Sequence, residues 1–143
     1  MASKLWDKKI QLDSDIERYT IGKDAEMDMY LARYDVLGSM AHATMLESVG
    51  LLSNDDLQAL LKGLRSIYKE IEKGNFKIED GVEDIHSQVE LMLGEVGKKL
   101  HSGRSRNDQV LVDLKLFTRA KIQELVASVN DLFETLIAQS NLY

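Results

Sequence analysis

The side chains best suited to chemistry gather in one short stretch, KKLHSGRSRNDQV, at residues 98–110. The formal net charge of the 143-residue chain is −6, yet five basic residues fall within nine positions here: Lys98, Lys99, His101, Arg104 and Arg106. A guanidinium group is a planar fork that matches a carboxylate or a phosphate. Short polar residues and a glycine are interleaved with the basic ones: Ser102, Gly103, Ser105 and Asn107. This composition predicts a loop that binds a small anion.

A long helix is predicted to follow this loop, because neither glycine nor proline occurs from Asp108 to Tyr143. The free N–H groups and the positive dipole end of such a helix would face the bound anion. A structural alternative remains open, in which Ser105 or Asn107 only caps the helix, Asp108 complements its dipole and the arginines are solvated. A phosphate-binding Walker loop is excluded, since its glycine and lysine spacing is missing.

The histidines offer two further candidates. His86, in VEDIHSQVE, could carry a proton or donate to a bound carboxylate, or it could be a helix-start histidine bonded to a neighbour. His42, in GSMAHATML, lies in a run of small residues and is expected to be structural. The three scattered histidines form no metal-ligand motif, so we predict no metal site. No pairing of nucleophile and base supports covalent catalysis.

Apolar periodicity predicts an all-α fold that would position these residues. Helices are expected over residues 24–50 and 53–74, and a third should start at Asp80 or Asp84. The third helix would bury Ile85, Val89, Met92 and Val96. The last helix carries a wide apolar seam: Ile122, Leu125, Val126, Val129, Leu132, Phe133, Leu136 and Ile137. A seam of this width needs partner helices, so we expect the chain to self-associate.

Composition bears on where the protein is found and on which partners it can bind. The chain has no cysteine, and no signal peptide or transmembrane segment is recognisable, so we expect a cytoplasmic protein. Its negative total charge argues against nucleic-acid or membrane partners, which need an extended basic face. The absence of proline favours long helices over a loop-rich fold.

The segment KLHSGRSRNDQV closely resembles the signature of the argininosuccinate lyase family. The stretches KLW at 4–6, YDVLGSMAHATML at 34–46 and EDIHSQVE at 83–90 extend the resemblance along the whole chain. It implies an N-terminal helical domain with an irregular arm at residues 1–104, and the start of a central helical bundle at 105–143. Family members are much longer homotetramers, so the last helix is expected to be cut here.

The resemblance also implies a reaction and a site. Argininosuccinate would be cleaved to arginine and fumarate by anti elimination, without a metal or an organic cofactor. The substrate-binding residues would be Ser105, Arg106 and Asn107, with Ser102, Arg104 and Asp108 shaping the loop and Asp84 and His86 bordering it. The family's catalytic serine loop and Thr-His pair have no counterpart in this chain. No catalytic residue is therefore assigned, and the chain alone is expected to be inactive.

Three departures from the family pattern stand out. KLWDKKI at 4–10 lacks two glycines and an arginine, and YTIGKD at 19–24 replaces a segment with a substrate-contacting serine. Between His86 and His101 the chain is about one helical turn short of the family pattern. Two alternatives stay open: a sister lyase acting on adenylosuccinate or aspartate, and a non-catalytic helical module like the lens crystallins of this fold.

Overall fold

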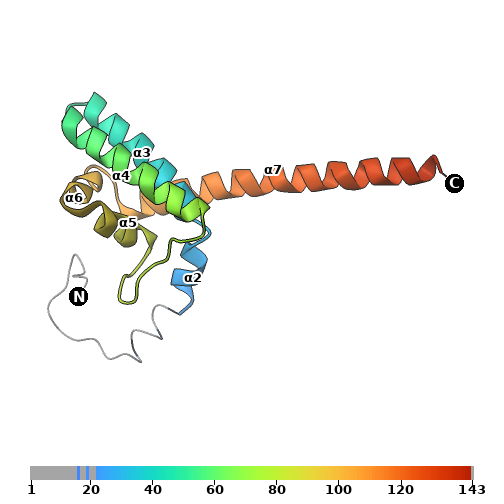
Figure 1. Cartoon of the computed structure of the whole chain (residues 1–143), viewed down its shortest axis with the longest axis horizontal. Coiled ribbons are helices and arrows are strands. Elements are labelled where there is room, and N and C mark those ends of the chain that lie inside the picture. Colours follow the sequence, from blue (N-terminus) through green and yellow to red (C-terminus); the bar gives the residue numbers. More distant parts are fainter. Residues whose placement is uncertain (1–15, 17–18, 20–21, 143) are drawn as a thin grey trace.

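The protein is described here by a computed structural model that covers residues 16, 19 and 22–142. Every regular element in this part of the chain is helical, as predicted (Figure 1). The elements are α2 (Asp24–Asp28), α3 (Ala32–Ser48), α4 (Asn54–Glu72), α5 (Ile85–Leu93), the 3₁₀ helix η1 (Gly94–Val96), α6 (Gly97–Leu100) and α7 (Arg106–Ser140). Most of the expected irregular arm at residues 1–23 lies outside the described residues, including KLWDKKI and two residues of YTIGKD, Thr20 and Ile21.

Helices α3 and α4 lie side by side and form the centre of the folded body (Figure 1). The start of α4 is the predicted one, because the hydroxyl of Ser53 caps it by accepting from the amide of Asp56. The core residues come mainly from α3, α4 and α5: Val36, Ala43, Leu46, Leu57, Leu60, Leu64, Ile67, Ile85 and Val89. The apolar period of α4 therefore predicted its buried face correctly.

The expected continuous helix over residues 24–50 is divided in two. A turn at Met29–Leu31 separates α2 from α3. The turn lets the carboxylate of Asp28 accept the amide N–H of Ile85 at 3.2 Å, which joins α2 to the start of α5. Met27 is exposed, whereas Asp35 and Ser39 on α3 are buried. The inner face of α3 is thus partly polar, which its apolar pattern did not indicate.

The third predicted helix begins at Ile85, with Asp84 as its N-cap. It ends at Leu93, because Gly94 adopts the left-handed value φ = 66°. Ile85 and Val89 are buried as predicted, but the prediction for Met92 is wrong, since 48% of its surface is exposed.

Helix α7 begins against α3 and then extends well beyond the folded body (Figure 1). Near its start the rings of Tyr34 and Phe117 meet edge to face, with centroids 6.0 Å apart. Every residue from Lys121 to Leu142 is exposed. Among the described residues, no helix combines the length and apolar character needed to cross a membrane.

Candidate active-site region

The loop before α7 ends in a reciprocal cap. The hydroxyl of Ser105 accepts from the amide of Asp108, and the carboxylate of Asp108 accepts the amide N–H of Ser105 at 2.8 Å. The hydrogen bond from the Ser105 backbone lowers the pKa of Asp108. The structure therefore gives Ser105 the capping role that the structural alternative assigned to Ser105 or Asn107. Asp108, which that alternative expected only to complement the helix dipole, takes part in the cap.

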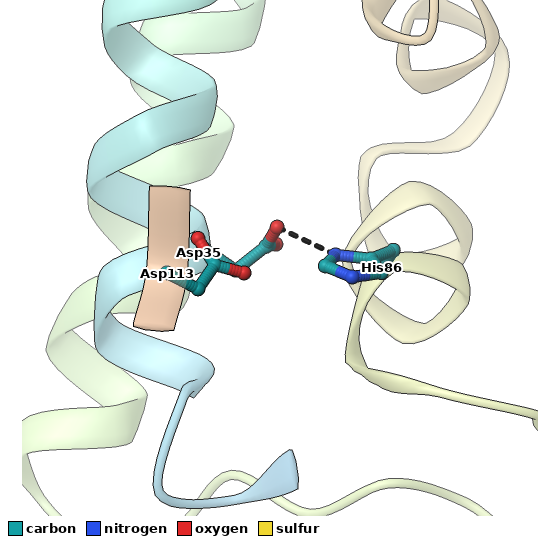
Figure 2. Close-up of side chains that lie close together, drawn as sticks. All are labelled: Asp35, His86 and Asp113. Atoms are coloured by element: carbon teal, nitrogen blue, oxygen red, sulfur yellow. Dashed lines mark hydrogen bonds and ion pairs between the residues drawn. The ribbon is translucent and has the colours of Figure 1, made fainter. Parts of the chain in front are cut away.

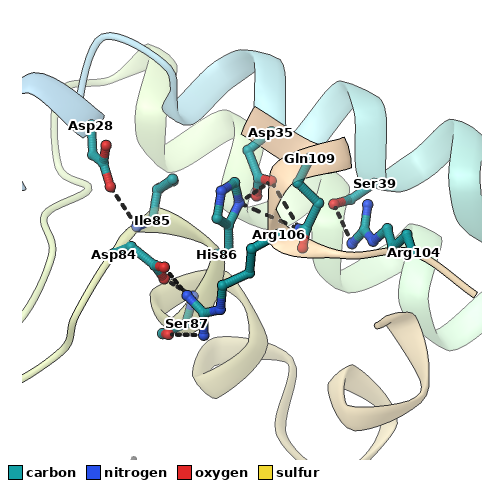
Figure 3. Close-up of polar contacts among 10 residues, drawn as sticks. All are labelled: Asp28, Asp35, Ser39, Asp84, Ile85, His86, Ser87, Arg104, Arg106 and Gln109. Carbon is teal, nitrogen blue, oxygen red and sulfur yellow. Dashed lines mark hydrogen bonds and ion pairs between the residues drawn. The ribbon is translucent and has the colours of Figure 1, made fainter. Parts of the chain in front are cut away.

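The two arginines are not solvated on the surface but turn inward to different helices (Figure 3). Nη2 of Arg104 donates to the hydroxyl of Ser39 on α3 at 3.1 Å. Nη2 of Arg106 donates to the hydroxyl of Ser87 on α5 at 2.9 Å, and the same guanidinium forms an ion pair with Asp84. Burial lowers the pKa of Arg104, although the charges of nearby carboxylates oppose this. The arginines thus connect the start of α7 to α3 and α5.

Beneath the arginines lies a buried polar cluster centred on His86. Its Nδ1 is 2.7 Å from Oδ1 of Asp35, and 6% and 2% of these two side chains are exposed (Figure 2). The amide of Gln109 donates to the same oxygen at 3.4 Å. Burial alone would lower the pKa of His86, but the hydrogen bond and charge of Asp35 outweigh it and raise the pKa. With Nδ1–H donated to Asp35, Nε2 is the nitrogen left to meet a ligand.

Asp113 is the third titratable member of this cluster. It lies one helical turn beyond Gln109 on the inner face of α7 and is only 1% exposed. Gly38 permits this close approach of α7, because a Cβ there would lie 3.3 Å from Val112 and 3.7 Å from Asp113. Burial raises the pKa of Asp113 to about 7.

The cluster adjoins two small cavities. One is lined by both arginines, His86 and His101, and its volume of about 10 Å³ is close to that of one water. The other lies between α3 and α7, has a volume of about 110 Å³ and is lined by Arg104, His42 and Asp113 among others. Binding a dicarboxylate in the first cavity would therefore require the arginine side chains to move.

Asp35, His86 and Asp113 are the one group among the described residues whose ligand atoms come close enough to suggest a metal site, within 4.8 Å of one another. Two observations argue against it. Nδ1 of His86 is engaged with Asp35, and the cationic Arg104 lines the adjoining cavity together with both carboxyls. These contacts disfavour a cation at this position, and we assign no metal ligand.

The residues predicted from sequence fall into three groups. Arg104, Arg106 and His86 line one cavity, and Asp84 holds Arg106 while its Oδ1 also caps α5. Ser105 and Asp108 cap α7. The side chains of Asn107 and Ser102 are exposed and do not line either of these cavities.

His42 is structural, as expected. Its Nε2 donates to the carbonyl oxygen of Ser102 at 2.8 Å, which fixes the basic loop against α3. Burial lowers the pKa of His42, which favours the neutral ring.

Sequence reasoning missed three residues of the cluster: Asp35, Gln109 and Asp113. A signal was present, because Arg106, Gln109 and Asp113 are spaced three and four residues apart and so share one face of a helix. A polar helix face is usually exposed to solvent. This spacing was therefore not interpreted as a sign of a buried cluster.

Comparison with known proteins defines the class. A sequence model described as Lyase matches residues 8–143, so the chain belongs to this lyase family. The chain is 63% identical to the argininosuccinate lyases of Parabacteroides distasonis and Bacteroides thetaiotaomicron, over its full length and 33% of theirs. It is also 45% identical to the argininosuccinate lyase of Methylococcus capsulatus, over 88% of this chain and 28% of that protein. The resemblance read from the sequence is confirmed, and the chain spans about a third of the length of these relatives.

The alignment with the Parabacteroides protein extends over 147 positions, four more than the chain has residues. At least four aligned positions therefore have no residue in this chain. This agrees with the predicted shortfall of about one helical turn, and its placement between His86 and His101 stays a prediction.

Proposed function

We propose that this chain is part of an argininosuccinate lyase, which cleaves argininosuccinate to arginine and fumarate. The observation that carries the proposal is the 63% identity, over the whole chain, to proteins named argininosuccinate lyase. The inward-facing Arg104 and Arg106 beside His86 support it, because they form a compact cationic site at the leading end of a long helix.

In this proposal the cationic site binds the succinyl carboxylates of the substrate. Removal of a proton beside a carboxylate creates a doubly charged, enolate-like intermediate, so electrostatic stabilisation is the main demand on the protein. Arg106 binds a carboxylate after partial release from Asp84, and His86 donates from Nε2. Ser105 and Asn107 surround the substrate, while Ser102, Arg104 and Asp108 shape the loop.

The complete activity needs more than this chain. We propose that the catalytic groups lie on segments outside it, that the full protein is a cytoplasmic homotetramer and that it uses no cofactor. The exposed apolar seam of α7 supports assembly, because a stripe of this size is normally covered by other helices. The 143-residue chain alone is expected to show no turnover.

A chimera provides the decisive experiment. This chain would replace the corresponding third of the Bacteroides thetaiotaomicron argininosuccinate lyase. Fumarate release from argininosuccinate would be followed by the ultraviolet absorbance of the conjugated product. We expect turnover within about tenfold of the parent, and a loss of about a hundredfold or more when Arg106→Lys removes the planar fork. Arg119→Lys, an exposed residue of α7, is the matched control and should have no effect.

The alternatives predict other outcomes of the same experiment. A chimera that cleaves adenylosuccinate or aspartate in preference to argininosuccinate would identify a sister lyase. A chimera that assembles as a folded tetramer but releases no fumarate from any of these substrates would identify a non-catalytic helical module. Either result would refute the proposed function.

A further inference from the structure

The buried cluster beneath the basic loop contains two carboxyl groups and one histidine. Asp35 comes from α3, His86 from α5 and Asp113 from α7, and their charged atoms lie within 4.8 Å of one another. Asp35 and Asp113 are 2% and 1% exposed, so water screens their mutual repulsion poorly. Two carboxylates at this separation in a buried site favour retaining a proton between them.

Hydrogen bonding distinguishes the two acids. Oδ1 of Asp35 accepts from both His86 and Gln109, so its charge is stabilised by direct contacts (Figure 3). Oδ2 of Asp113 is buried and has no hydrogen-bond partner, and the same holds for Oδ2 of Asp35. A buried carboxylate charge that no donor stabilises is costly, and the neutral acid costs less. The proton therefore belongs on Asp113.

Some charges around Asp113 raise its pKa and others lower it. Burial is the main cause that raises its pKa, and the negative charges of Asp35 and of Asp28 on α2 act the same way. The positive charges of His86 on α5 and Arg104 in the loop lower it. The result, about 7, places its titration in the physiological range.

We propose that Asp113 is a positioning residue that carries a proton below neutral pH and loses it above, so that the anion-binding site beneath Arg104 and His86 is one charge more positive when Asp113 is protonated. The proposal rests on the proposed function for the identity of the anion. When Asp113 loses its proton, the added negative charge opposes the dicarboxylate that the arginines bind. Anion affinity should then fall as the pH rises, although Asp113 itself lies behind the residues that meet the ligand.

The test uses fumarate as the probe and the 143-residue chain as the protein. Binding would be measured by NMR chemical-shift titration at pH 6 and pH 8, for the wild type and for Asp113→Asn, which mimics the protonated acid. We expect equal affinities at pH 6, and at pH 8 an affinity about tenfold higher for the variant, because only the wild type gains a charge. Because the charge of Asp113 contributes to the raised pKa of His86, the titration of His86 would be followed by NMR in both proteins, so that its own deprotonation is accounted for.

Asp131→Asn is the matched control, because Asp131 is exposed on the far part of α7, and it should equal the wild type at both pH values. Carbon-13 NMR of the aspartate carboxyls would follow the proton directly, with an expected midpoint near 7 for Asp113. A midpoint below about 5, or an equal advantage of Asp113→Asn at both pH values, would overturn the inference. A midpoint that shifts when magnesium is added would overturn it in favour of a cation site.

The carboxyl titration also separates this inference from the proposed function. If fumarate fails to bind at either pH while Asp113 titrates near neutrality, the anion-binding function of this chain fails and the protonated state of Asp113 stands. If fumarate binds and Asp113 titrates as an ordinary aspartate, the function stands and the inference fails.

Discussion

The two halves of α7 differ in which kind of side chain they bury. The first half packs against α3 and buries the polar side chains of Gln109 and Asp113. The second half carries the wide apolar seam from Ile122 to Ile137, and all of it is exposed on the part of α7 that extends beyond the folded body (Figure 1). Burial along this one helix therefore follows the position of neighbouring elements and not the hydrophobicity of the residues.

This difference shows what an apolar period means. A seam indicates that a face favours being covered, but it does not identify the element that covers it. Conversely, a polar residue becomes buried when its helix is anchored beside other elements, as the amide N–H of Gln109 is against the carboxylate of Asp35. Substitutions in the two halves of α7 and in its partner α3 should consequently have very different effects.

The largest effect is expected from Asp35→Ala on the packed side. It removes the acceptor of a buried histidine and should lower the free energy of unfolding by about 3–5 kcal/mol. Because Asp35 raises the pKa of His86, this stabilisation is complete below the ordinary value of 6.5 and is lost as the pH rises through the raised value. Urea unfolding at pH 6 and pH 9 should show a larger loss at pH 6.

Asp131→Ala, on the exposed half of α7, is the control and should change the free energy of unfolding by less than about 0.5 kcal/mol. Equal losses for the two variants would show that the His86–Asp35 contact adds nothing to stability.

Asp113→Asn should have the next largest effect, and it should stabilise the protein. The folded state holds the proton of Asp113 more tightly than the unfolded chain does, with a pKa of about 7 against 3.8. The wild type therefore loses stability as the pH rises from 3.8 to 7, whereas asparagine does not titrate. Chemical unfolding should show no difference near pH 4 and a gain of about 2 kcal/mol for the variant at pH 8. A variant that is less stable at pH 8 would contradict this assignment.

Ser105→Ala tests the junction at which the packed half begins. The substitution removes the hydroxyl that accepts from the amide of Asp108 and should cost about 1 kcal/mol of stability. Ser105→Asp should restore most of the loss, because a carboxylate also caps a helix. Thermal unfolding followed by circular dichroism would measure both, and Ser102→Ala, at an exposed loop position, should behave as the wild type.

The smallest effect on stability is expected in the outer half. Leu125→Lys combined with Leu132→Lys replaces two exposed side chains, 63% and 60% accessible, and should change the free energy of unfolding by less than about 0.5 kcal/mol. The same pair should reduce self-association in sedimentation experiments, because it places charges in the seam. A clean monomer for the wild type at high concentration would contradict the predicted self-association.

The sequence predicted most of the helices, since α4 carries a full amphipathic period and Ser53 and Asp84 are good N-caps. It did not predict the turn at Met29–Leu31, because no glycine or proline marks it and a contact distant in sequence, between Asp28 and Ile85, accompanies it. It identified Arg104, Arg106 and His86, whose types are unusual enough to stand out in a short stretch. It missed Asp35 and Asp113, because single aspartates on helices normally face water.

The sequence by itself determined the helical class, the cationic loop at the start of the last helix and the family, because these depend on residue types and on spacings within one segment. Only the tertiary structure decided that Arg104 and Arg106 turn to different helices and that two acids and a histidine from three helices share one buried site. Such contacts join residues as far apart as Asp35 and Asp113, and chain packing, not local periodicity, brings them together.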